Sequence, residues 1–330
     1  MENSRIIIIG AGSWGTALAV SLHQSGKKVT LWGRRPEMVV ELCTSRYSAY
    51  LPGVFLPVDM AISSAYGDIS IADIILWAVP VQQSQILLEQ LKEYIPSSAP
   101  IIVCSKGLVL ETQQPLSGLF KKSLLNPIGV LSGPNFADEV AKNLPAASTL
   151  AFENLDLAKN LACHLRHKAF RVYAHHDVIG VEMAGALKNV AAIAAGIVMG
   201  RELGHNCLAM LITRANAEIC RLASALGAFP DTGKTLAGIG DLMLTCSSVK
   251  SRNTSLGFAL AKGQSLEDIL KARSNVTEGV ATAKVAFDLA KSHKIHAPII
   301  SAMYSILYEG QSIDDTVHSI LSSQQQQELE

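Results

Sequence analysis

The chain has 330 residues, of which 49% are hydrophobic and 17% charged, so it can bury a large core and is neither a small disulfide-stapled fold nor a disordered chain. Lysines and arginines total 28, as do aspartates and glutamates, and this balance argues against nucleic acid or anionic membranes as partners. The 6 cysteines show no C-x-x-C spacing, which argues against a zinc site and favours a reducing cytoplasm. The apolar stretches 5–22 and 189–200 are broken by glycines or shorter than the ~20 residues of a membrane span, so we expect neither export nor membrane insertion.

The first 175 residues alternate short aliphatic runs with stretches of helical length. This alternation is typical of a parallel sheet covered by helices on both faces, and it predicts a doubly wound α/β domain. The expected strands are Ile6–Ile9, Val29–Trp32, Ile74–Val79, Ile101–Cys104 and Ile128–Leu131, with weaker ones at Ala146–Ala151 and Phe170–Tyr173. The expected helices are Trp14–Ser25, Pro36–Thr44, Val81–Tyr94 and Thr112–Ser123.

A glycine-rich turn follows the first expected strand. Residues 10–15 read Gly-Ala-Gly-Ser-Trp-Gly and open a helix. In this pattern Gly10 permits the tight turn, Gly12 lets a pyrophosphate approach the backbone, and Gly15 allows the helix to pack closely on the strand. The free N–H groups at the start of the helix then face the anion. The sequence therefore predicts a Rossmann-type dinucleotide site here rather than an ordinary glycine-rich turn.

The end of the second expected strand indicates which dinucleotide binds. An NAD-selective site usually has an acidic residue there for the ribose hydroxyls, whereas this chain reads Leu-Trp-Gly-Arg-Arg over residues 31–35. The guanidiniums of Arg34 and Arg35 suit a 2′-phosphate, which each can bind through two hydrogen bonds. The alternative is that both arginines are solvated surface residues. We favour NADP(H), with NAD(H) tolerated.

Ligands of open α/β sheets lie beyond the carboxyl ends of the strands, so the residues that follow each strand are candidates for the site. They are Val79-Pro80, Ser105-Lys106-Gly107 and the segment from Ser132 to Phe136. Lys106 is the only charged side chain among them. We expect a lysine at that position to meet a phosphate or a carbonyl.

The strand pattern ends after residue 177, and alanine-rich helical stretches continue almost to the C-terminus. We therefore expect a dinucleotide-binding domain over 1–177 and an all-α substrate-binding and catalytic domain over 178–330. The helix expected from Val178 to Met199 contains one internal cation, Lys188, whose helical neighbours are alanines and a glycine. Burial among them would lower the pKa of the lysine toward neutrality and make the amine a usable general acid or base. The alternative is a surface lysine on an exposed stripe.

A later segment carries polar side chains suited to a phosphate. Ser251, Arg252 and Asn253 open a helix, where side-chain donors and free backbone N–H groups converge. The alternative is an ordinary polar helix cap. The histidines support no metal site, because His164 and His167 are expected on a solvated basic face.

These motifs, in this order, resemble those of the bacterial NAD(P)-dependent glycerol-3-phosphate dehydrogenases. The likeness extends from Ile6 to about Leu307. It is carried by GAGSWGTALA from Gly10, SKGL from Ser105, SGPNFADEVA from Ser132, ALKNVAAIAAG from Ala186, GDLMLTC from Gly240, SRN from Ser251 and VTEG from Val276.

The resemblance implies a role for most of the residues singled out above. Lys188 would be the catalytic proton donor and acceptor. The substrate would be surrounded by Lys188, Lys106, Gly133, Asn135, Asp241, Ser251, Arg252 and Asn253. Besides the glycine turn and Arg35, the cofactor would be lined by Ser13, Trp14, Arg34, Lys106, Ala137, Arg252, Val276 and Glu278.

The chain departs from the family pattern at two places. Asn135 stands where serine or threonine is usual, and it keeps a hydrogen-bonding side chain. Cys207-Leu208 replaces a typical alanine followed by a basic residue, which alters local packing or an interface contact.

The reaction implied is reversible hydride transfer between NAD(P)H and C2 of dihydroxyacetone phosphate, giving sn-glycerol 3-phosphate for glycerophospholipid synthesis without a metal. We expect a homodimer that binds small molecules and neither nucleic acid nor membranes. Two alternatives stay open. A related NADP-dependent reductase or β-hydroxyacid dehydrogenase would need a carboxylate-binding site in place of the phosphate site. A non-catalytic NADP(H)-sensing module would keep the glycine turn and have no need of Lys188.

Overall fold

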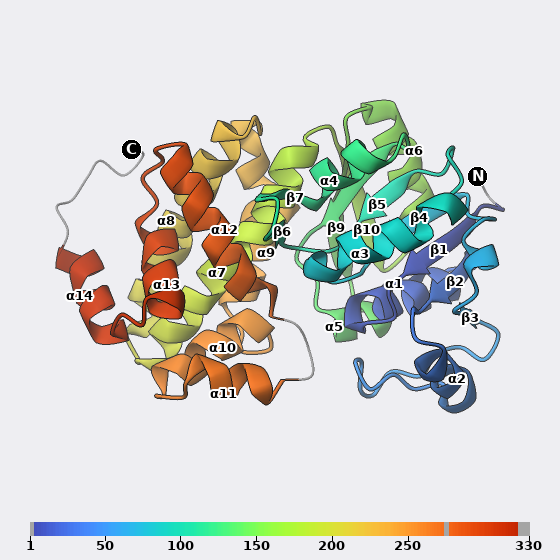
Figure 1. The fold of residues 1–330 in the computed structure, drawn as a ribbon. Coiled ribbons are helices and arrows are strands. Elements are labelled where there is room, and N and C mark those ends of the chain that lie inside the picture. Colours follow the sequence, from blue (N-terminus) through green and yellow to red (C-terminus); the bar gives the residue numbers. More distant parts are fainter. Residues whose placement is uncertain (1–2, 274–276, 323–330) are drawn as a thin grey trace. The chain divides into compact units, whose positions relative to one another are not determined.

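The computed structural model describes residues 3–273 and 277–322. The chain forms two compact units, Met1–Ser105 with Leu116–Val178, and Lys106–Pro115 with Ile179–Glu330 (Figure 1). The second unit thus begins beside residue 178, where the strand pattern of the sequence ends. It also takes in Lys106–Pro115, which the sequence analysis places in the first domain.

The first unit is built on an eight-stranded sheet with the strand order β10-β9-β8-β5-β4-β1-β2-β3. The strands are β1 (Arg5–Ile9), β2 (Lys28–Trp32), β3 (Ala61–Ser63), β4 (Ile74–Trp77), β5 (Ile101–Val103), β8 (Ile128–Ser132), β9 (Ala146–Phe152) and β10 (Phe170–His175). Six neighbouring strands of this sheet, β3, β2, β1, β4, β5 and β8, are parallel to one another. Strand β9 runs antiparallel to β8, and β10 is parallel to β9. Because the chain leaves β1 for β2 on one side and returns to β4 on the other, ligands are expected beyond the carboxyl ends of β1 and β4.

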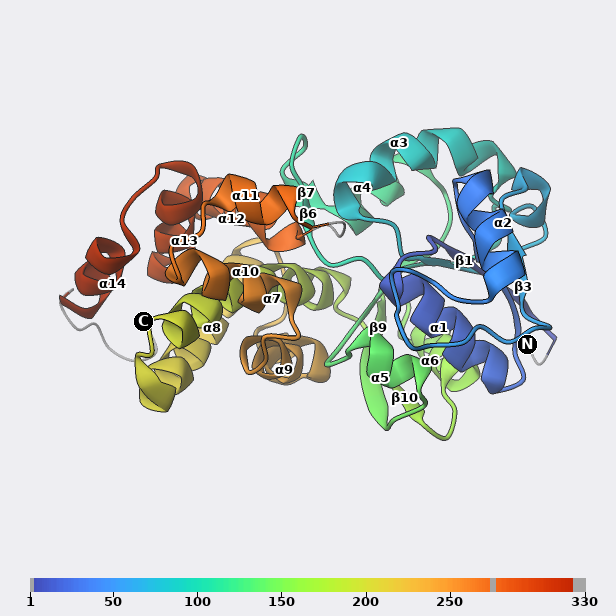
Figure 2. The same cartoon turned by 90° about the horizontal axis from the view of Figure 1, so that it is seen from below.

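Helices cover both faces of this sheet, with α1, α5 and α6 on one side and α3 and α4 on the other (Figure 2). The helices are α1 (Ser13–Gln24), α2 (Pro36–Ser45), α3 (Val81–Leu91), α4 (Leu116–Ser123), α5 (Ala137–Ala141) and α6 (Leu155–Leu165), with 3-10 turns at Tyr66–Asp68 and Lys92–Tyr94. Side chains along β1 point alternately to the two faces of the sheet, and this explains why helices cover both faces. Ile6 and Ile8 join the core formed with α1 and α6, so Ile7 and Ile9 point to the opposite layer, and all four are at most 1% exposed.

In its described residues, the second unit is helical apart from one hairpin. Its helices are α7 (Val178–Gly200), α8 (Gly204–Ala225), α9 (Asp241–Cys246), α10 (Arg252–Ala261), α11 (Leu266–Lys271), α12 (Glu278–Ser292), α13 (Pro298–Tyr308) and α14 (Ile313–Ser322). A 3-10 turn lies at Pro230–Lys234 and a π turn at Leu236–Gly240. Helix α7 is long and apolar enough to cross a membrane, but 94% of its apolar stretch is buried inside the protein. It is therefore the core helix of this unit, packed with α8, α10, α12 and α13.

The expected architecture, a Rossmann-type sheet domain followed by a helical domain, is confirmed, although strand β3 was not expected and β9 runs antiparallel to β8. The helix expected over Thr112–Ser123 begins only at Leu116, because Gln114–Pro115 forms strand β7 and pairs with β6 (Leu108–Val109). Pro115 lacks an N–H and disfavours a helical backbone at the residue before it, and Gln113 turns the hairpin with a φ of 51°. This hairpin belongs by its contacts to the helical unit.

Candidate active site

The glycine-rich turn joins β1 to α1 at the carboxyl end of the sheet. Gly10 has a φ of 114°, and a Cβ there would lie 2.7 Å from the carbonyl oxygen of Ala78. A Cβ on Gly15 would lie 1.9 Å from the carbonyl oxygen of Gly10, so the helix and the strand approach too closely for a side chain. Around the Cβ position of Gly12, in contrast, no described residue other than its own neighbours along the chain has an atom within 4 Å. Nor does any described side chain cap the start of α1, whose N–H groups therefore suit an anion in this open space.

Two exposed arginines, Arg34 and Arg35, follow β2. The guanidinium of Arg35 donates a hydrogen bond of 2.9 Å to the hydroxyl of Tyr50, and the hydroxyl of Ser13 donates one of 2.7 Å to the carbonyl oxygen of Tyr50. Tyr50 thus ties the arginine segment to the start of α1. The sequence analysis missed this residue because the stretch between α2 and β3 has no regular periodicity. Open space at Gly12, an uncapped helix start and two nearby guanidiniums together fit a phosphorylated dinucleotide.

Gly133, Asn135 and Ala137 lie after β8, also in the first unit, and Ala137 begins α5. The side-chain nitrogen of Asn135 donates to the hydroxyl of Ser148 at 2.8 Å and to the carbonyl oxygen of Ala147 at 3.2 Å. Its side-chain oxygen is buried and accepts no hydrogen bond from the described residues. The amide therefore holds this loop to β9, and its oxygen is the group left for a ligand.

Lys188 lies in α7, in the second unit, with only 8% of its side chain exposed. Its Nζ lies 2.5 Å from Oδ1 of Asp241 and donates a hydrogen bond of 2.6 Å to the hydroxyl of Thr245. The other carboxylate oxygen of Asp241 accepts a hydrogen bond of 2.6 Å from Nζ of Lys106. One buried carboxylate thus lies between two lysines. The structure brings together Lys188, Lys106 and Asp241, as the resemblance implies, and it excludes an exposed stripe for Lys188.

Helix α9 positions both partners of the Lys188 amine. Asp241 is its first residue, and Thr245 lies one turn later on the same face. The hydroxyl of Thr245 donates to Oδ1 of Asp241 at 3.3 Å, and its carbonyl oxygen accepts a bond of 2.7 Å from the hydroxyl of Thr254. Sequence reasoning gave Thr245 no role at the site, although its four-residue spacing from Asp241 is a signal that could have found it.

The pKa of Lys188 is lowered to about 8, chiefly because burial disfavours the charged form and further because Lys106 lies close by, while Asp241 acts in the opposite direction. The amine is therefore mostly protonated at neutral pH and gives up its proton within about one pH unit of neutrality. Burial raises the pKa of the neighbouring Cys246 thiol to about 12, so this cysteine stays protonated and is not a nucleophile.

Buried side-chain amides join four segments around the lysines. Asn189 donates to the carbonyl oxygen of Lys106 at 3.0 Å, and Asn253 donates to the side-chain oxygen of Asn189 at 2.9 Å. The side-chain oxygen of Asn253 accepts a bond of 3.1 Å from the N–H of Gly279. This chain of amides connects the hairpin segment, α7, α10 and the start of α12. Asn189, which sequence reasoning missed, stands next to Lys188 in α7.

The first turn of α10 carries the other polar residues that the sequence singled out. Ser251 caps the helix, since its hydroxyl accepts a bond of 3.3 Å from the N–H of Thr254. Arg252 is the first helical residue and is exposed, yet the protein displaces enough water around it to lower its pKa, an effect that Glu278 opposes. Glu278 begins α12. Val276 lies outside the described residues.

His164 and His167 do not lie on a solvated face, contrary to the sequence expectation. His164 is 7% exposed, and burial lowers its pKa. His167 is half-buried, with Nε2 lying 2.9 Å from the hydroxyl of Ser21 in α1. The packing of α6 on β9 and β10 explains the burial of His164, and the contact with Ser21 explains that of His167. Within residues 3–273 and 277–322, no group of three or more histidine, cysteine or acidic side chains is arranged to hold a metal ion.

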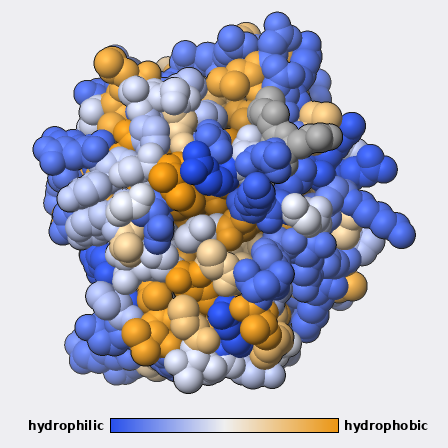
Figure 3. All heavy atoms as spheres, turned by 90° about the vertical axis from the view of Figure 1, so that its right-hand side faces the viewer, coloured by the Kyte–Doolittle hydropathy of each residue, from blue (hydrophilic) through white to orange (hydrophobic). Residues whose placement is uncertain are grey.

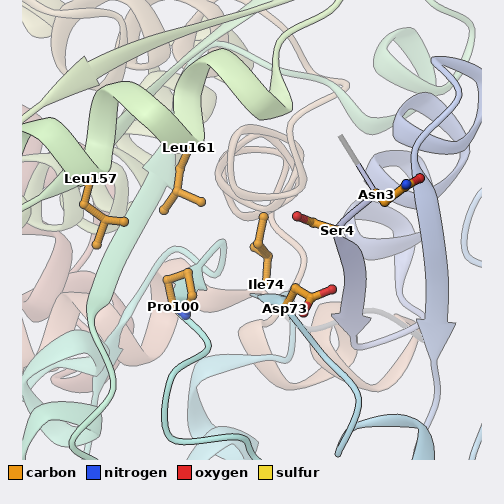
Figure 4. A pocket seen from close by; sticks show the side chains of 7 residues that line it. All are labelled: Asn3, Ser4, Asp73, Ile74, Pro100, Leu157 and Leu161. Carbon is orange, nitrogen blue, oxygen red and sulfur yellow. The ribbon is translucent and has the colours of Figure 1, made fainter. Parts of the chain in front are cut away.

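A hollow of about 440 Å³ lies at the amino ends of β1, β4 and β5, away from the glycine turn (Figure 4). It is lined by Asn3, Ser4, Asp73, Ile74, Pro100, Leu157 and Leu161. Asp73 accepts a bond of 2.8 Å from the N–H of Arg5, so its carboxylate already has a partner. Figure 3 shows the face of the molecule on the right-hand side of Figure 1, where hydrophobic and hydrophilic side chains are interspersed. Because parallel sheets bind nucleotides at the carboxyl ends of their strands, we do not assign the nucleotide to this hollow.

Comparison with known proteins identifies the family. The profile described as NAD-dependent glycerol-3-phosphate dehydrogenase N-terminus matches residues 5–158, and the corresponding C-terminus profile matches residues 177–318. The glycerol-3-phosphate dehydrogenase (NAD(P)+) of Gluconobacter oxydans is 44% identical over 96% of each chain, and that of Caulobacter vibrioides is 42% identical over 98% of each. The crystal structure of glycerol-3-phosphate dehydrogenase from Coxiella burnetii superposes with a TM-score of 0.93 at 36% identity, over 98% of this chain and 100% of that one. The chain therefore belongs to the NAD-dependent glycerol-3-phosphate dehydrogenase family.

Proposed function

We propose that this protein catalyses the reversible reduction of dihydroxyacetone phosphate to sn-glycerol 3-phosphate with NAD(P)H. The observation that carries the proposal is the buried Lys188, which shares the carboxylate of Asp241 with Lys106. A buried amine with a pKa of about 8 is suited to exchange a proton with a carbonyl oxygen. The substrate follows from the family, whose members from Gluconobacter oxydans and Caulobacter vibrioides are named for it. The product would feed glycerophospholipid synthesis.

The first unit would hold the nucleotide. Its pyrophosphate fits the open space at Gly12 and the uncapped start of α1, which begins with Ser13 and Trp14. When bound, NAD(P)H supplies the hydride that reduces the carbonyl carbon. Further ligand contacts in this unit would come from Gly133, Asn135 and Ala137.

The cofactor preference would be for NADP(H). Arg34 and Arg35 stand at the end of β2, where an acidic residue would otherwise bind the ribose hydroxyls. Tyr50 holds the guanidinium of Arg35, so this side chain is already oriented before a 2′-phosphate arrives. NAD(H) would still bind through the glycine turn.

Lys188 would act as the general acid in the direction of reduction. Of the three N–H bonds of its ammonium group, two are used by Asp241 and Thr245, which leaves one for the substrate oxygen. As the carbonyl carbon is reduced, its oxygen gains negative charge and takes the proton from Lys188. In the reverse direction the neutral amine removes the proton from the C2 hydroxyl. Lys106, held by the same carboxylate, adds a second positive charge that stabilises the developing oxyanion.

The phosphate of the substrate would bind at the start of α10. Arg252 supplies a guanidinium there, and the first N–H groups of the helix supply further donors. Ser251 and Asn253 hold this turn, the first as its cap and the second through Asn189. A phosphate bound remotely from the reacting carbonyl orients the substrate, which raises the rate as well as the affinity.

The test is NADPH oxidation with dihydroxyacetone phosphate, with unphosphorylated dihydroxyacetone as the control. We expect rapid turnover of the phosphorylated ketone and slow turnover of the control. Turnover of a 2-keto acid instead would favour the related reductase or β-hydroxyacid dehydrogenase, and NADPH binding without any turnover would favour the sensing module. The family match does not favour either alternative.

A cytoplasmic homodimer is the assembly that we propose. The cysteines Cys43 and Cys163 are exposed and unpaired, which suits a reducing compartment. Helix α8 leaves Met210 48% exposed and Leu208 and Leu211 half-buried, an apolar surface suited to a second copy of the chain. Light scattering coupled to size exclusion would test the assembly.

A further inference from the structure

Arg273, two residues beyond the end of α11, bonds to the first turn of α10. Its Nη1 donates a hydrogen bond of 2.6 Å to the carbonyl oxygen of Arg252, and its Nη2 donates one of 3.0 Å to the hydroxyl of Ser255. That hydroxyl in turn donates to the carbonyl oxygen of Arg252 at 3.1 Å. The guanidinium therefore clamps the turn that carries the proposed phosphate contact. Helices α10 and α11 are direct neighbours, as Figures 1 and 2 also show.

Arg273 also places a second guanidinium charge near Arg252. Burial lowers the pKa of Arg273, and the positive charge of Arg252 lowers it further, so the two groups repel each other. In the described part of the chain the hydrogen-bond partners of Arg273 are a carbonyl and a hydroxyl, neither of which neutralises its charge. A guanidinium has five N–H groups, and the two bonds of Arg273 leave others for an anion.

The carboxylate of Glu278 raises the pKa of Arg252, so it offsets part of the positive charge of the two guanidiniums. Arg273 adds a second guanidinium, so these three side chains together carry net positive charge beside the first turn of α10. A phosphate dianion gains more from this charge than a carboxylate monoanion does. The charges thus favour a phosphorylated ketone over a keto acid.

We propose that Arg273 is a positioning residue of the phosphate site, which fixes the first turn of α10 and, with Arg252, makes the site selective for a dianion. This proposal rests on the proposed function, because it assumes that the substrate phosphate binds at α10. Sequence reasoning gives no signal for Arg273, since the residue follows a short helix and its contact depends on how α11 packs on α10.

The test compares Arg273→Met and Arg273→Lys with the wild type and with Arg201→Met. Arg201 is a matched control in the same unit, 37% exposed and paired with Asp314. The measurements are kcat/KM for dihydroxyacetone phosphate and for dihydroxyacetone, the inhibition constant of inorganic phosphate, and thermal unfolding.

For Arg273→Met we expect kcat/KM for dihydroxyacetone phosphate to fall roughly 10- to 100-fold, mainly through KM, and the inhibition constant of inorganic phosphate to rise by a similar factor. The reduction of dihydroxyacetone should change less than about twofold, because this substrate makes no phosphate contact. Arg273→Lys keeps the charge but cannot form both bonds from one planar group, so its values should lie between those of the wild type and Arg273→Met. Arg201→Met should match the wild type.

Equal losses for both substrates would mean that Arg273 only stabilises the fold, and unchanged phosphate inhibition would mean that it has no part in the site. Either result overturns the proposal. Should Arg273→Met fail to fold, Arg273→Lys decides, because an inhibition constant equal to that of the wild type would overturn the positioning role. A wild-type enzyme with no preference for dihydroxyacetone phosphate over dihydroxyacetone would instead contradict the proposed function, whatever the variants do.

Discussion

Replacing Lys188 by methionine removes the amine but keeps much of the side-chain volume, so little cavity forms in the core around α7. If Lys188 is the general acid, the single-turnover rate of ketone reduction should fall by about 10²- to 10⁴-fold. The glycine turn lies in the other unit, and NADPH affinity should therefore persist. The same substitution is also expected to raise the free energy of unfolding, whereas most substitutions in a core lower it.

The expected gain in stability follows from the pKa of Lys188. In the folded protein this pKa falls from 10.5 to about 8, a difference of roughly 2.5 units or about 3 kcal/mol. The folded pKa of this base is lower than the unfolded one, so the protonated amine destabilises the fold fully below pH 8. This cost disappears as the pH rises from 8 to 10.5. Lys188→Met should thus be more stable than the wild type at pH 7, by up to about 3 kcal/mol, because Asp241 keeps Lys106 as a partner.

Urea unfolding of both proteins between pH 7 and pH 10.5 measures this difference, and NADPH fluorescence with single-turnover reduction measures the chemistry. Lys262→Met is a matched control, since Lys262 is 45% exposed and pairs with Glu202 at the surface. A Lys188→Met protein that is less stable than the wild type at pH 7, or whose advantage does not shrink toward pH 10.5, would refute the argument from burial. A folded, NADPH-binding variant that reduces the ketone at the wild-type rate would refute the role of Lys188.

Four further substitutions test other parts of the site and the fold. Arg34→Ala should weaken NADPH binding roughly 10- to 100-fold and NADH binding much less, as fluorescence titration would show; equal losses would contradict the preference for NADP(H). Arg252→Ala should lower kcat/KM for dihydroxyacetone phosphate by roughly 30- to 1,000-fold, and an unchanged value would exclude Arg252 from the phosphate site. Thr245→Val removes an acceptor of the Lys188 ammonium and should lower its pKa further, so the alkaline limb of the pH–rate profile for reduction should move about one unit down; an unmoved limb would contradict the contact. Glu218 accepts from the N–H groups that begin α13, and burial raises its pKa from 4.5 to about 7, so the stability that it contributes is full below pH 4.5 and is lost as the pH rises through 7. Chemical unfolding of Glu218→Gln should lack this loss, and a variant with the wild-type pH dependence would contradict the assignment.

The sheet and its glycine turn could be predicted because local chemistry determines them. The aliphatic runs of the strands are buried on both faces, and only glycine tolerates the backbone approaches at Gly10 and Gly15. The hairpin before α4 could not be predicted in the same way, because its strands have two residues each and their pairing depends on contacts with the helical unit. His164 was misjudged for a related reason, since charged neighbours in sequence do not reveal that α6 packs on β9 and β10.

The candidate site was predicted best where a residue type is unusual for its surroundings. Lys188 stands out as a charge among alanines and glycines, and the structure places it in the core. Asn189 and Thr245 do not stand out, because amides and hydroxyls are common in helices and only the fold brings them to Lys106 and Lys188. The resemblance supplied Asp241, whose role as a shared partner of two lysines depends on segments more than 50 residues apart along the chain.

Glycines in α7 and α10, at the positions where the two helices touch, explain how the proposed proton donor and the proposed phosphate site are held at a fixed distance from each other. A Cβ on Gly257 would lie 1.9 Å from the carbonyl oxygen of Ile193, and one on Gly196 would lie 2.0 Å from the carbonyl oxygen of Thr254. The two backbones are therefore in direct contact, and any side chain at these positions would force α10 away from α7. Since Lys188 lies on α7 and Arg252 begins α10, this contact sets the distance between the proposed proton donor and the proposed phosphate contact. A substrate whose phosphate and carbonyl match that distance is held with its carbonyl oriented before reaction, so the small residues of α7 contribute to specificity as well as to packing.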